Sequence, residues 1–231
     1  MTDYEAVFWD IGGVILDHES VQEGHEVFVT ELTERFETDL SPAAMLDVFR
    51  DELGAYFRET DGNEYRVART GYRRSVQAIL TEDADRVDWE PLFRTIHGTY
   101  AESNPWAVET IERLADTPLH LGVISDVDHE EGKRILSDLG VRRYFDAFTS
   151  SEEVGRKKPD PAMFETALEK AAVDPERSAM IGDRYSHDMV GGDEFGMTTI
   201  AYGAEDGPAV DYVIEDLREV LEIVGIGPIG E

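Results

Sequence analysis

Short apolar runs followed by small polar residues recur along this chain, and segments of helical spacing separate most of them. Such runs are typical of buried strands, and strands that alternate with helices favour a parallel sheet. The pattern predicts six strands: Ala6 to Ile11, Leu119 to Ser125, Ala147 to Ser150, Ala179 to Asp183, Thr198 to Tyr202 and Tyr212 to Ile214. We therefore expect an α/β fold with a doubly wound, mainly parallel sheet.

Two helices between these strands have recognisable ends. Asp128 is a predicted N-cap with Glu131 three residues further on, and Gly140 is a predicted stop. Asp160 followed by Pro161 predicts a second helix start, because proline is favoured at the first helical position.

The segment from residue 18 to residue 100 has helical spacing of its apolar residues and no convincing strand. Helix breakers at Ser41-Pro42, Asp61-Gly62-Asn63 and Glu90-Pro91 divide it into about four helices. We therefore expect residues 18–100 to form a helical domain, and residues 1–17 and 101–231 to form the α/β core.

The charge balance excludes one class of partner. The chain has 51 acidic and 21 basic residues, which gives a net charge of −30. This charge repels polyanions at long range, so we expect no nucleic-acid partner. Only Lys133, Lys157, Lys158 and Lys170 are lysines. An acidic excess with so little lysine resembles the composition of halophilic proteins, whose self-repulsion is screened by molar salt.

No segment predicts export or a membrane partner. The first residues lack a basic stretch before an apolar one, and no apolar run approaches the ~20 residues that span a bilayer. We expect a cytoplasmic protein. Because the chain has no cysteine, oxygen or histidine must hold any metal, and carboxylates are the most numerous candidates.

The first candidate site residue is Asp10, at the end of the first predicted strand and before Gly12 and Gly13. Open parallel sheets bind ligands at the edge where their strands end. Taken alone, Asp10 is equally well explained as a polar residue that closes a strand before a tight turn.

Three further segments follow Asp10 in an order that resembles the haloacid dehalogenase-like hydrolases. Leu121 to Ser125 is similar to the second motif of that family, an apolar strand ending in Ser or Thr. Gly155 to Pro161 resembles its lysine motif, in which Lys158 precedes a proline. Met180 to Asp188 resembles its fourth motif, in which Gly-Asp is followed by a second Asp.

This resemblance covers residues 5–16 and 119–203. It implies a Rossmann-like core, with the helical domain inserted as a cap between the first two motifs. It also implies that Asp10 is a nucleophile forming an aspartyl-phosphate, assisted by Ser125 and Lys158. The implied metal is Mg²⁺, with these ligands: Asp10, the carbonyl of Gly12, Asp183 and Asp188. The expected core contacts to substrate are Gly13, Ser125, Asp126 and Lys158.

Two positions depart from the family pattern. Phosphatases of this family usually carry a general acid two residues after the nucleophile, where this chain has Gly12. Its absence is expected to slow hydrolysis of poor leaving groups by about 10² to 10⁴-fold. The second position is Asp126, commonly Asn or Gly in relatives. Asp126 is explained by a halophilic replacement, by helix capping near Asp128, or by selection of a cationic substrate group.

The helical domain also offers Arg66, Arg69 and Arg73 at helical spacing. These arginines are predicted either to bind an anionic part of the substrate or to pair with the many acids around them.

The sequence therefore predicts a Mg²⁺-dependent phosphatase acting on a small phosphorylated metabolite. One alternative is a 2-haloacid dehalogenase, which attacks carbon and needs no metal. A second alternative is a non-catalytic binding protein of the same fold, because Gly12 stands where the usual general acid is expected.

Overall fold

The strands predicted from the sequence form one sheet. The structure, a computed structural model, describes residues 4–60 and 62–227. Within these residues the sheet has six strands: β1 Ala6–Trp9, β2 His120–Ser125, β3 Ala147–Ser150, β4 Ser178–Gly182, β5 Thr198–Tyr202 and β6 Tyr212–Ile214. The strand order is β3-β2-β1-β4-β5-β6, and every neighbouring pair is parallel. The predicted α/β fold is confirmed, although β1 ends at Trp9 and not at Ile11.

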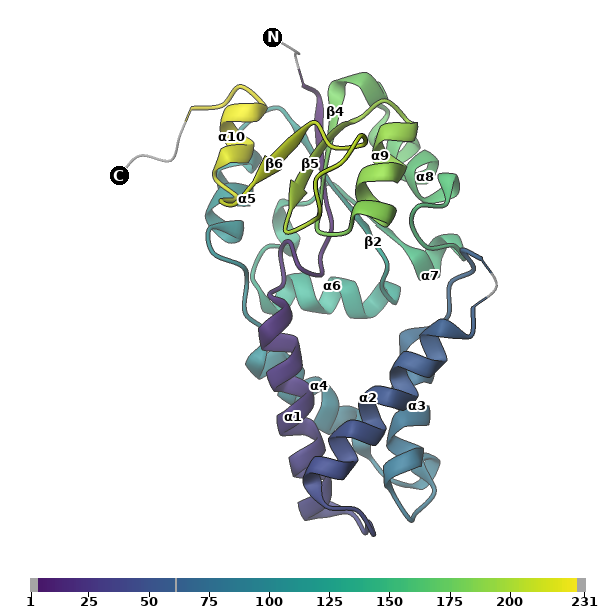
Figure 1. Cartoon of the computed structure of the whole chain (residues 1–231). Helices are drawn as coiled ribbons and strands as arrows, with labels where there is room; N and C mark the ends of the chain where they lie inside the picture. The colour runs from purple at the N-terminus through teal and green to yellow at the C-terminus, as the bar shows by residue number, and fades with distance from the viewer. Residues whose placement is uncertain (1–3, 61, 228–231) are drawn as a thin grey trace. The chain divides into compact units, whose positions relative to one another are not determined.

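Helices cover both faces of this sheet. The helices of this part are α5 Ala107–Ala115, α6 His129–Asp138, α7 Ser151–Val154, α8 Pro161–Ala171, the π-helix η4 Tyr185–Met189, α9 Val190–Glu194 and α10 Glu219–Ile223, with short 3₁₀ turns η2 Arg142–Tyr144 and η3 Pro175–Arg177. In Figure 1, α8 and α9 lie on one side of the sheet and α5 and α10 on the other. Ala6 and Phe8 pack against α8, so the alternating Val7 and Trp9 point to the opposite face.

Both predicted helix starts are observed. Asp160 caps α8 by accepting a hydrogen bond from the backbone N–H of Ala162 at 3.1 Å, and Pro161 occupies the first helical position. Asp128 occupies the N-cap position of α6, but its side chain makes no capping hydrogen bond.

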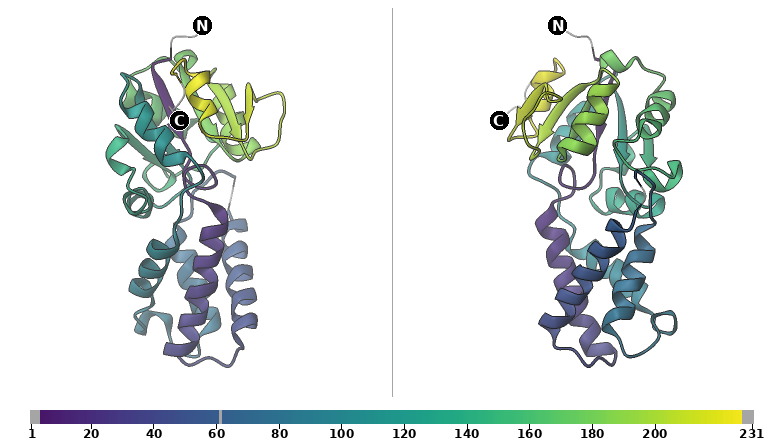
Figure 2. Two further views of the ribbon diagram at one scale, coloured as in Figure 1. Left: turned by 90° about the vertical axis from the view of Figure 1, so that its left-hand side faces the viewer. Right: turned by 45° about the vertical axis from the view of Figure 1, so that its right-hand side comes forward.

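The segment between β1 and α5 folds as a separate helical unit. Its helices are α1 His18–Arg35, α2 Pro42–Arg58, α3 Ala68–Ile79 and α4 Trp89–Tyr100, with one 3₁₀ turn, η1 Ala84–Arg86. Figure 2 shows α1 to α4 packed alongside one another. Their shared core includes Phe28, Leu32, Met45, Phe49, Val76 and Phe93, all buried.

The third predicted boundary of this segment lies at the start of α4. Glu90 and Pro91 are in the first turn of that helix, directly after Trp89, where the N–H groups have no partner within the helix. Ser41 also marks a helix start, since its hydroxyl accepts from the N–H of Ala44. Asp61, part of another predicted breaker, lies outside the described residues.

The contacts divide the chain into two compact units. One contains the segment up to Asp17 together with the segment from Glu102 onward, and the other is His18–Ala101. The two ends of the first unit are joined directly, because the N–H of Asp17 donates to the carbonyl of Glu102 at 2.9 Å and Leu16 bridges Ser103. Among the described helices, none has the length and apolarity needed to cross a membrane.

Candidate active site

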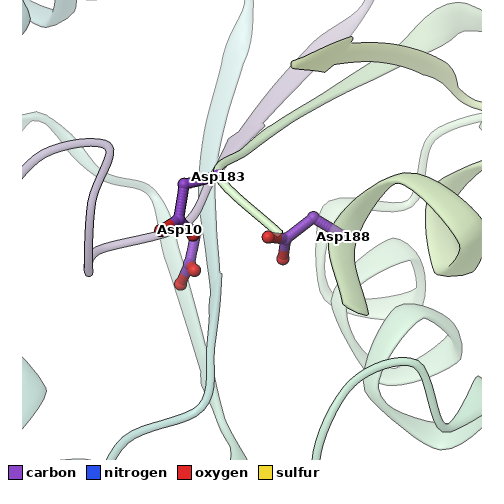
Figure 3. A group of neighbouring side chains, drawn as sticks. All are labelled: Asp10, Asp183 and Asp188. Atoms are coloured by element: carbon purple, nitrogen blue, oxygen red, sulfur yellow. The ribbon is translucent and has the colours of Figure 1, made fainter. Parts of the chain in front are cut away.

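Three carboxylates converge where β1 and β4 end. Asp10 follows β1, Asp183 follows β4, and Asp188 lies in η4. Each offers one oxygen to a cluster whose ligand atoms lie within 4.8 Å of one another. Figure 3 shows Asp10 and Asp183 side by side and Asp188 pointing toward them from η4. Asp10 and Asp188 are buried, and Asp183 is half-buried.

Strand register explains this convergence. Trp9 lies beside Ile181 in the sheet, and the N–H of Asp10 continues the ladder by donating to the Ile181 carbonyl at 3.0 Å. Asp10 therefore emerges beside Gly182. A Cβ at Gly182 would lie 2.1 Å from the Cβ of Asp188, so only glycine lets η4 approach β4 this closely.

Lys158 supplies the counter-charge inside this cluster. Its side chain is only 1% exposed, and Nζ lies 3.1 Å from Oδ1 of Asp10 and 2.5 Å from Oδ1 of Asp188. Nζ also donates to the carbonyl of Ile124 at 2.9 Å. The Lys158 ammonium group thus contacts two carboxylates of the cluster and one backbone carbonyl.

Burial and charge shift the pKa values of this cluster. Burial raises the pKa of Asp10, against the lowering effects of Lys158 and of a hydrogen bond from Ser125. Burial also raises the pKa of Asp188, to about 7, with the Asp10 charge adding to the effect. The pKa of Lys158 is raised because the nearby carboxylates outweigh its burial. The ionised forms of these two buried carboxylates are thus disfavoured mainly by their removal from water.

A tight turn follows Asp10. Gly13 has φ of 74°, a left-handed conformation that favours glycine, and its N–H donates to the Leu16 carbonyl at 2.9 Å. The amide of Asn104 donates to the carbonyls of Gly13 at 2.9 Å and Val14 at 3.0 Å. Gly13 therefore shapes the turn, and its N–H is already used within the protein. The role of Gly12 as a carbonyl ligand stays a prediction.

Comparison with known proteins identifies the family of the chain. Residues 4–196 match the model of the haloacid dehalogenase-like hydrolases. The chain belongs to this family. The resemblance inferred from the four motifs is thus confirmed.

Curated relatives of this hydrolase include two named phosphatases. The pyrophosphatase PpaX of Oceanobacillus iheyensis is 27% identical over 136 residues, which cover 56% of this chain and 63% of that protein. The glyceraldehyde 3-phosphate phosphatase of Methanothermobacter thermautotrophicus is 33% identical over 131 residues, covering 52% and 58% respectively. The matches thus span about six tenths of each relative's length.

Solved structures show the same fold over nearly the whole hydrolase. A phosphatase of the family from Thermococcus onnurineus has a TM-score of 0.75 at 23% identity, covering 97% of this chain and 100% of that one. YfnB from Bacillus subtilis, solved with bound magnesium, has a TM-score of 0.73 at 19% identity, covering 96% and 99%.

The side chain of Asp126 in this hydrolase connects three segments of the chain by hydrogen bonds. Its Oδ1 accepts from the hydroxyl of Ser151 at 2.6 Å and from the N–H of Lys158 at 2.8 Å. Its Oδ2 lies 3.0 Å from Nδ1 of His187 in η4. Burial would raise the pKa of Asp126, but the hydrogen bond from His187 and the other contacts lower it to about 2. Both oxygens are thus engaged by the protein, a role that none of the three sequence explanations described.

The arginines expected to contact substrate pair with acids of the helical unit. Arg66 lies before the start of α3, so it does not share a helical face with Arg69 and Arg73 as expected. Arg66 donates to the Tyr56 carbonyl at 2.7 Å and lies over the ring of the same residue. The remaining pairs are Arg66 with Glu59, Arg69 with Glu90, and Arg73 with Asp85. Substrate binding by these arginines stays a prediction and would require exchange of these partners.

Proposed function

We propose that this hydrolase is a Mg²⁺-dependent phosphatase acting on a small phosphorylated metabolite. The observation that carries the proposal is the convergence of Asp10, Asp183 and Asp188, two of which contact Lys158. Three carboxylates and one ammonium leave the cluster two positive charges short of neutrality. A divalent cation with a preference for oxygen ligands supplies this charge.

The donor set fits Mg²⁺. Carboxylate oxygens are hard ligands, and Mg²⁺ needs few of them because it keeps several waters. Asp10, Asp183 and Asp188 would hold the ion, together with the carbonyl of Gly12. When bound, the ion withdraws charge from the phosphoryl oxygens as a Lewis acid.

The residues of the chain have complementary roles in this proposal. The Asp10 carboxylate attacks phosphorus, so that an O–P bond to Asp10 forms as the bond to the leaving group breaks. Water then hydrolyses the aspartyl-phosphate, releasing phosphate and restoring the carboxylate. The Lys158 ammonium and the Ser125 hydroxyl, both already in contact with Asp10, hold the phosphoryl oxygens.

Hydrolysis of a phosphoester panel in molar KCl tests the proposal. We expect phosphate release with Mg²⁺, none with EDTA, and none from the Asp10→Asn variant. Asp193→Asn is the matched control, because Asp193 is exposed on α9 and the same charge is removed there.

Three outcomes contradict the proposal. Phosphate release that survives EDTA would exclude a metal-dependent reaction. Halide release from a 2-haloacid in the presence of EDTA would favour the dehalogenase alternative. The absence of turnover with every phosphoester and haloacid would favour the non-catalytic binding protein that Gly12 suggests.

A further inference from the structure

Arg184 lies at the edge of the sheet directly after Asp183. Its backbone is extended, with φ of −124° and ψ of 110°, and its N–H donates to Oδ2 of Asp188 at 3.0 Å. The backbone of Arg184 is thus fixed by the carboxylate cluster itself. The side chain therefore starts from a defined point beside the candidate catalytic centre.

The guanidinium group of Arg184 is tethered as well. Its NH2 group lies 2.8 Å from Nε2 of His187. Arginine only donates hydrogen bonds, so Nε2 must accept and the ring proton must reside on Nδ1. Nδ1 then donates to Oδ2 of Asp126 at 3.0 Å. A chain of hydrogen bonds thus connects Arg184, through His187, to the carboxylate that also holds the backbone of Lys158.

Among the described residues, no carboxylate lies within hydrogen-bonding distance of this guanidinium. Its ion-pair distance to Oδ2 of Asp126 is 4.0 Å, beyond hydrogen-bonding range, and its side chain is 52% exposed. Arg218, in contrast, contacts Asp216 at 2.6 Å, and Arg177 pairs directly with Glu5. A guanidinium has five N–H donors, so Arg184 keeps donors for a further acceptor.

We propose that Arg184 binds a second anionic group of the substrate, a carboxylate or phosphate carried by the leaving group. The inference rests on the proposed phosphatase activity. Asp10, Ser125 and Lys158 would hold the reacting phosphoryl group, and Arg184 lies one residue from Asp183 and close to Asp126, which follows Ser125. The planar fork of arginine suits two-point contact with carboxylate or phosphate oxygens.

Charge supports the same assignment. Asp126 adds a fourth carboxylate to the rim of the site, and without compensation it would repel an anionic leaving group. Arg184 offsets this charge from a position that remains accessible. His187 is a positioning residue in this scheme, because it contacts Arg184 and Asp126 and not the substrate.

Matched substrates test the assignment. We would compare phenyl phosphate with 4-carboxyphenyl phosphate and 1,4-phenylene bisphosphate, which share an aryl leaving group and differ in the second anion. Arg184→Gln is expected to lower kcat/KM for the two doubly anionic substrates by about tenfold, mainly through KM. The value for phenyl phosphate should change less than about twofold.

Arg177→Gln is the matched control, because Arg177 precedes β4 at the opposite end of the same strand. The Arg177→Gln variant should change kcat/KM neither for the doubly anionic substrates nor for phenyl phosphate. His187→Ala should lose part of the preference for the second anion while Arg184 is still present. Equal losses for all substrates in Arg184→Gln, or the same loss in Arg177→Gln, would overturn the assignment.

A binding measurement separates this inference from the proposed function. In the Asp10→Asn background, calorimetry gives the Kd of each phosphate without turnover. A preference for the doubly anionic compounds that disappears on Arg184→Gln supports the assignment even where the wild-type protein hydrolyses none of them. Equal Kd values for all three compounds would overturn it, even where phenyl phosphate is hydrolysed.

Discussion

Gly12 and Gly13 are adjacent, but their backbones allow different substitutions. Gly13 has φ of 74°, where a side chain costs about 1 to 2 kcal/mol, whereas Gly12 lies outside this left-handed region. A larger residue at Gly12 therefore meets no conformational penalty of this kind. The backbone angles at this position therefore do not exclude an ionisable side chain.

Gly12→Asp is expected to raise kcat on alkyl phosphates. The new carboxyl would give a proton to the departing alkoxide, an effect of about 10²-fold, and aryl phosphates would gain less because their leaving groups need less protonation. Steady-state rates of the variant and the wild type on an alkyl and an aryl phosphate measure the two gains. Gly13→Ala should instead lower Tm. A lower rate on both substrates for Gly12→Asp at unchanged Tm would show that glycine itself is needed there, or that another acid already serves.

Two kinds of sequence signal identified the central residues of the site. Asp10 was predicted from its place at the end of a strand, whereas Asp183 and Lys158 were predicted from motifs that resemble those of the family. Arg184 and His187 were missed because the hydrogen bond that connects them to the site runs from His187 to Asp126, 61 residues away in the sequence. Sequence spacing carries no signal for such a contact.

The turn after β1 depends on a residue from the other end of the helical insertion. Asn104 lies 91 residues from Gly13 and donates to two carbonyls of the turn, Gly13 and Val14. Its own N–H donates to the carbonyl of Ile15 at 3.0 Å. The side chain of Asn104 thus fixes the loop that carries Gly12 beside Asp10.

Replacement of Asn104 should destabilise this loop, and the size of the loss should depend on the new residue. Asn104→Ala leaves two carbonyls without donors, which costs about 1 to 3 kcal/mol. Asn104→Asp should cost more, because a carboxylate that only accepts hydrogen bonds would face two carbonyl oxygens. Urea unfolding measures the order, and the rate of phosphoester hydrolysis should fall in parallel. A variant Asn104→Asp as stable as Asn104→Ala would argue against the two donated hydrogen bonds.

Helix α1 places a neutral histidine inside the helical unit. The ring of His25 lies 4.9 Å from that of His97 and 5.3 Å from that of Phe49, centroid to centroid. Burial lowers the pKa of His25 to about 3, with the nearby His97 and Arg50 adding to the effect. The folded helices therefore exclude the proton that an unfolded histidine binds below about pH 6.5.

Acid should weaken these helices through His25. The contribution of neutral His25 to the free energy of unfolding is complete above about pH 6.5. It falls as the pH drops toward about 3, and about 1 to 2 kcal/mol is lost at about pH 5. Amide hydrogen exchange in α1 and α4 at about pH 7.5 and pH 5 measures the change, after correction for intrinsic exchange. His25→Leu should remove this part of the pH dependence.

A comparison between variants is needed because protonation of Asp188 changes the stability of the protein with pH in the opposite direction. Its pKa is raised to about 7, so the folded protein binds a proton there first and gains stability as the pH falls. His18→Leu is the matched control, since His18 is exposed at the start of the same helix. An identical pH dependence in His25→Leu and wild type would contradict the assignment to His25.

At the level of elements, the pattern of apolar runs sufficed for the sheet. The strands β1, β2 and β4 are buried on both faces, so each is a nearly continuous apolar run, for example Leu121 to Ile124. Glu90 and Pro91 located the start of α4 to within a turn, because a proline is compatible with the first turn of a helix.

The whole molecule carries a net charge of −30, and the basic side chains Lys158 and Arg184 lie beside carboxylates at the candidate site. Most arginine contacts in the described residues are ion pairs near the surface, such as Arg50 with Glu26 and Arg35 with Glu31. Such pairs contribute little to stability, so they do not offset the repulsion among so many acids. The folded state is therefore expected to depend on screening by salt.

Added KCl should raise Tm. The Debye length falls from about 10 Å at 0.1 M to about 3 Å at 1 M, so most of the gain is expected below about 1 M. A gain of about 2 kcal/mol corresponds to a rise of about 4 to 8 °C for a chain of this size. Calorimetry at increasing KCl, and at equal ionic strength of NaCl, gives the dependence.

A charge-reduced variant decides whether the screening of charge repulsion causes the rise of Tm with KCl. Exposed acids outside the candidate site would be replaced by amides: Glu23, Glu34, Asp47, Glu165, Glu169 and Glu194. With less self-repulsion, this variant should have a higher Tm at low salt and a smaller rise with KCl. An equal rise in both proteins would mean that salt acts on apolar burial and not on charge. A rise that continues unchanged far above about 1 M would have the same meaning, because screening is then already complete.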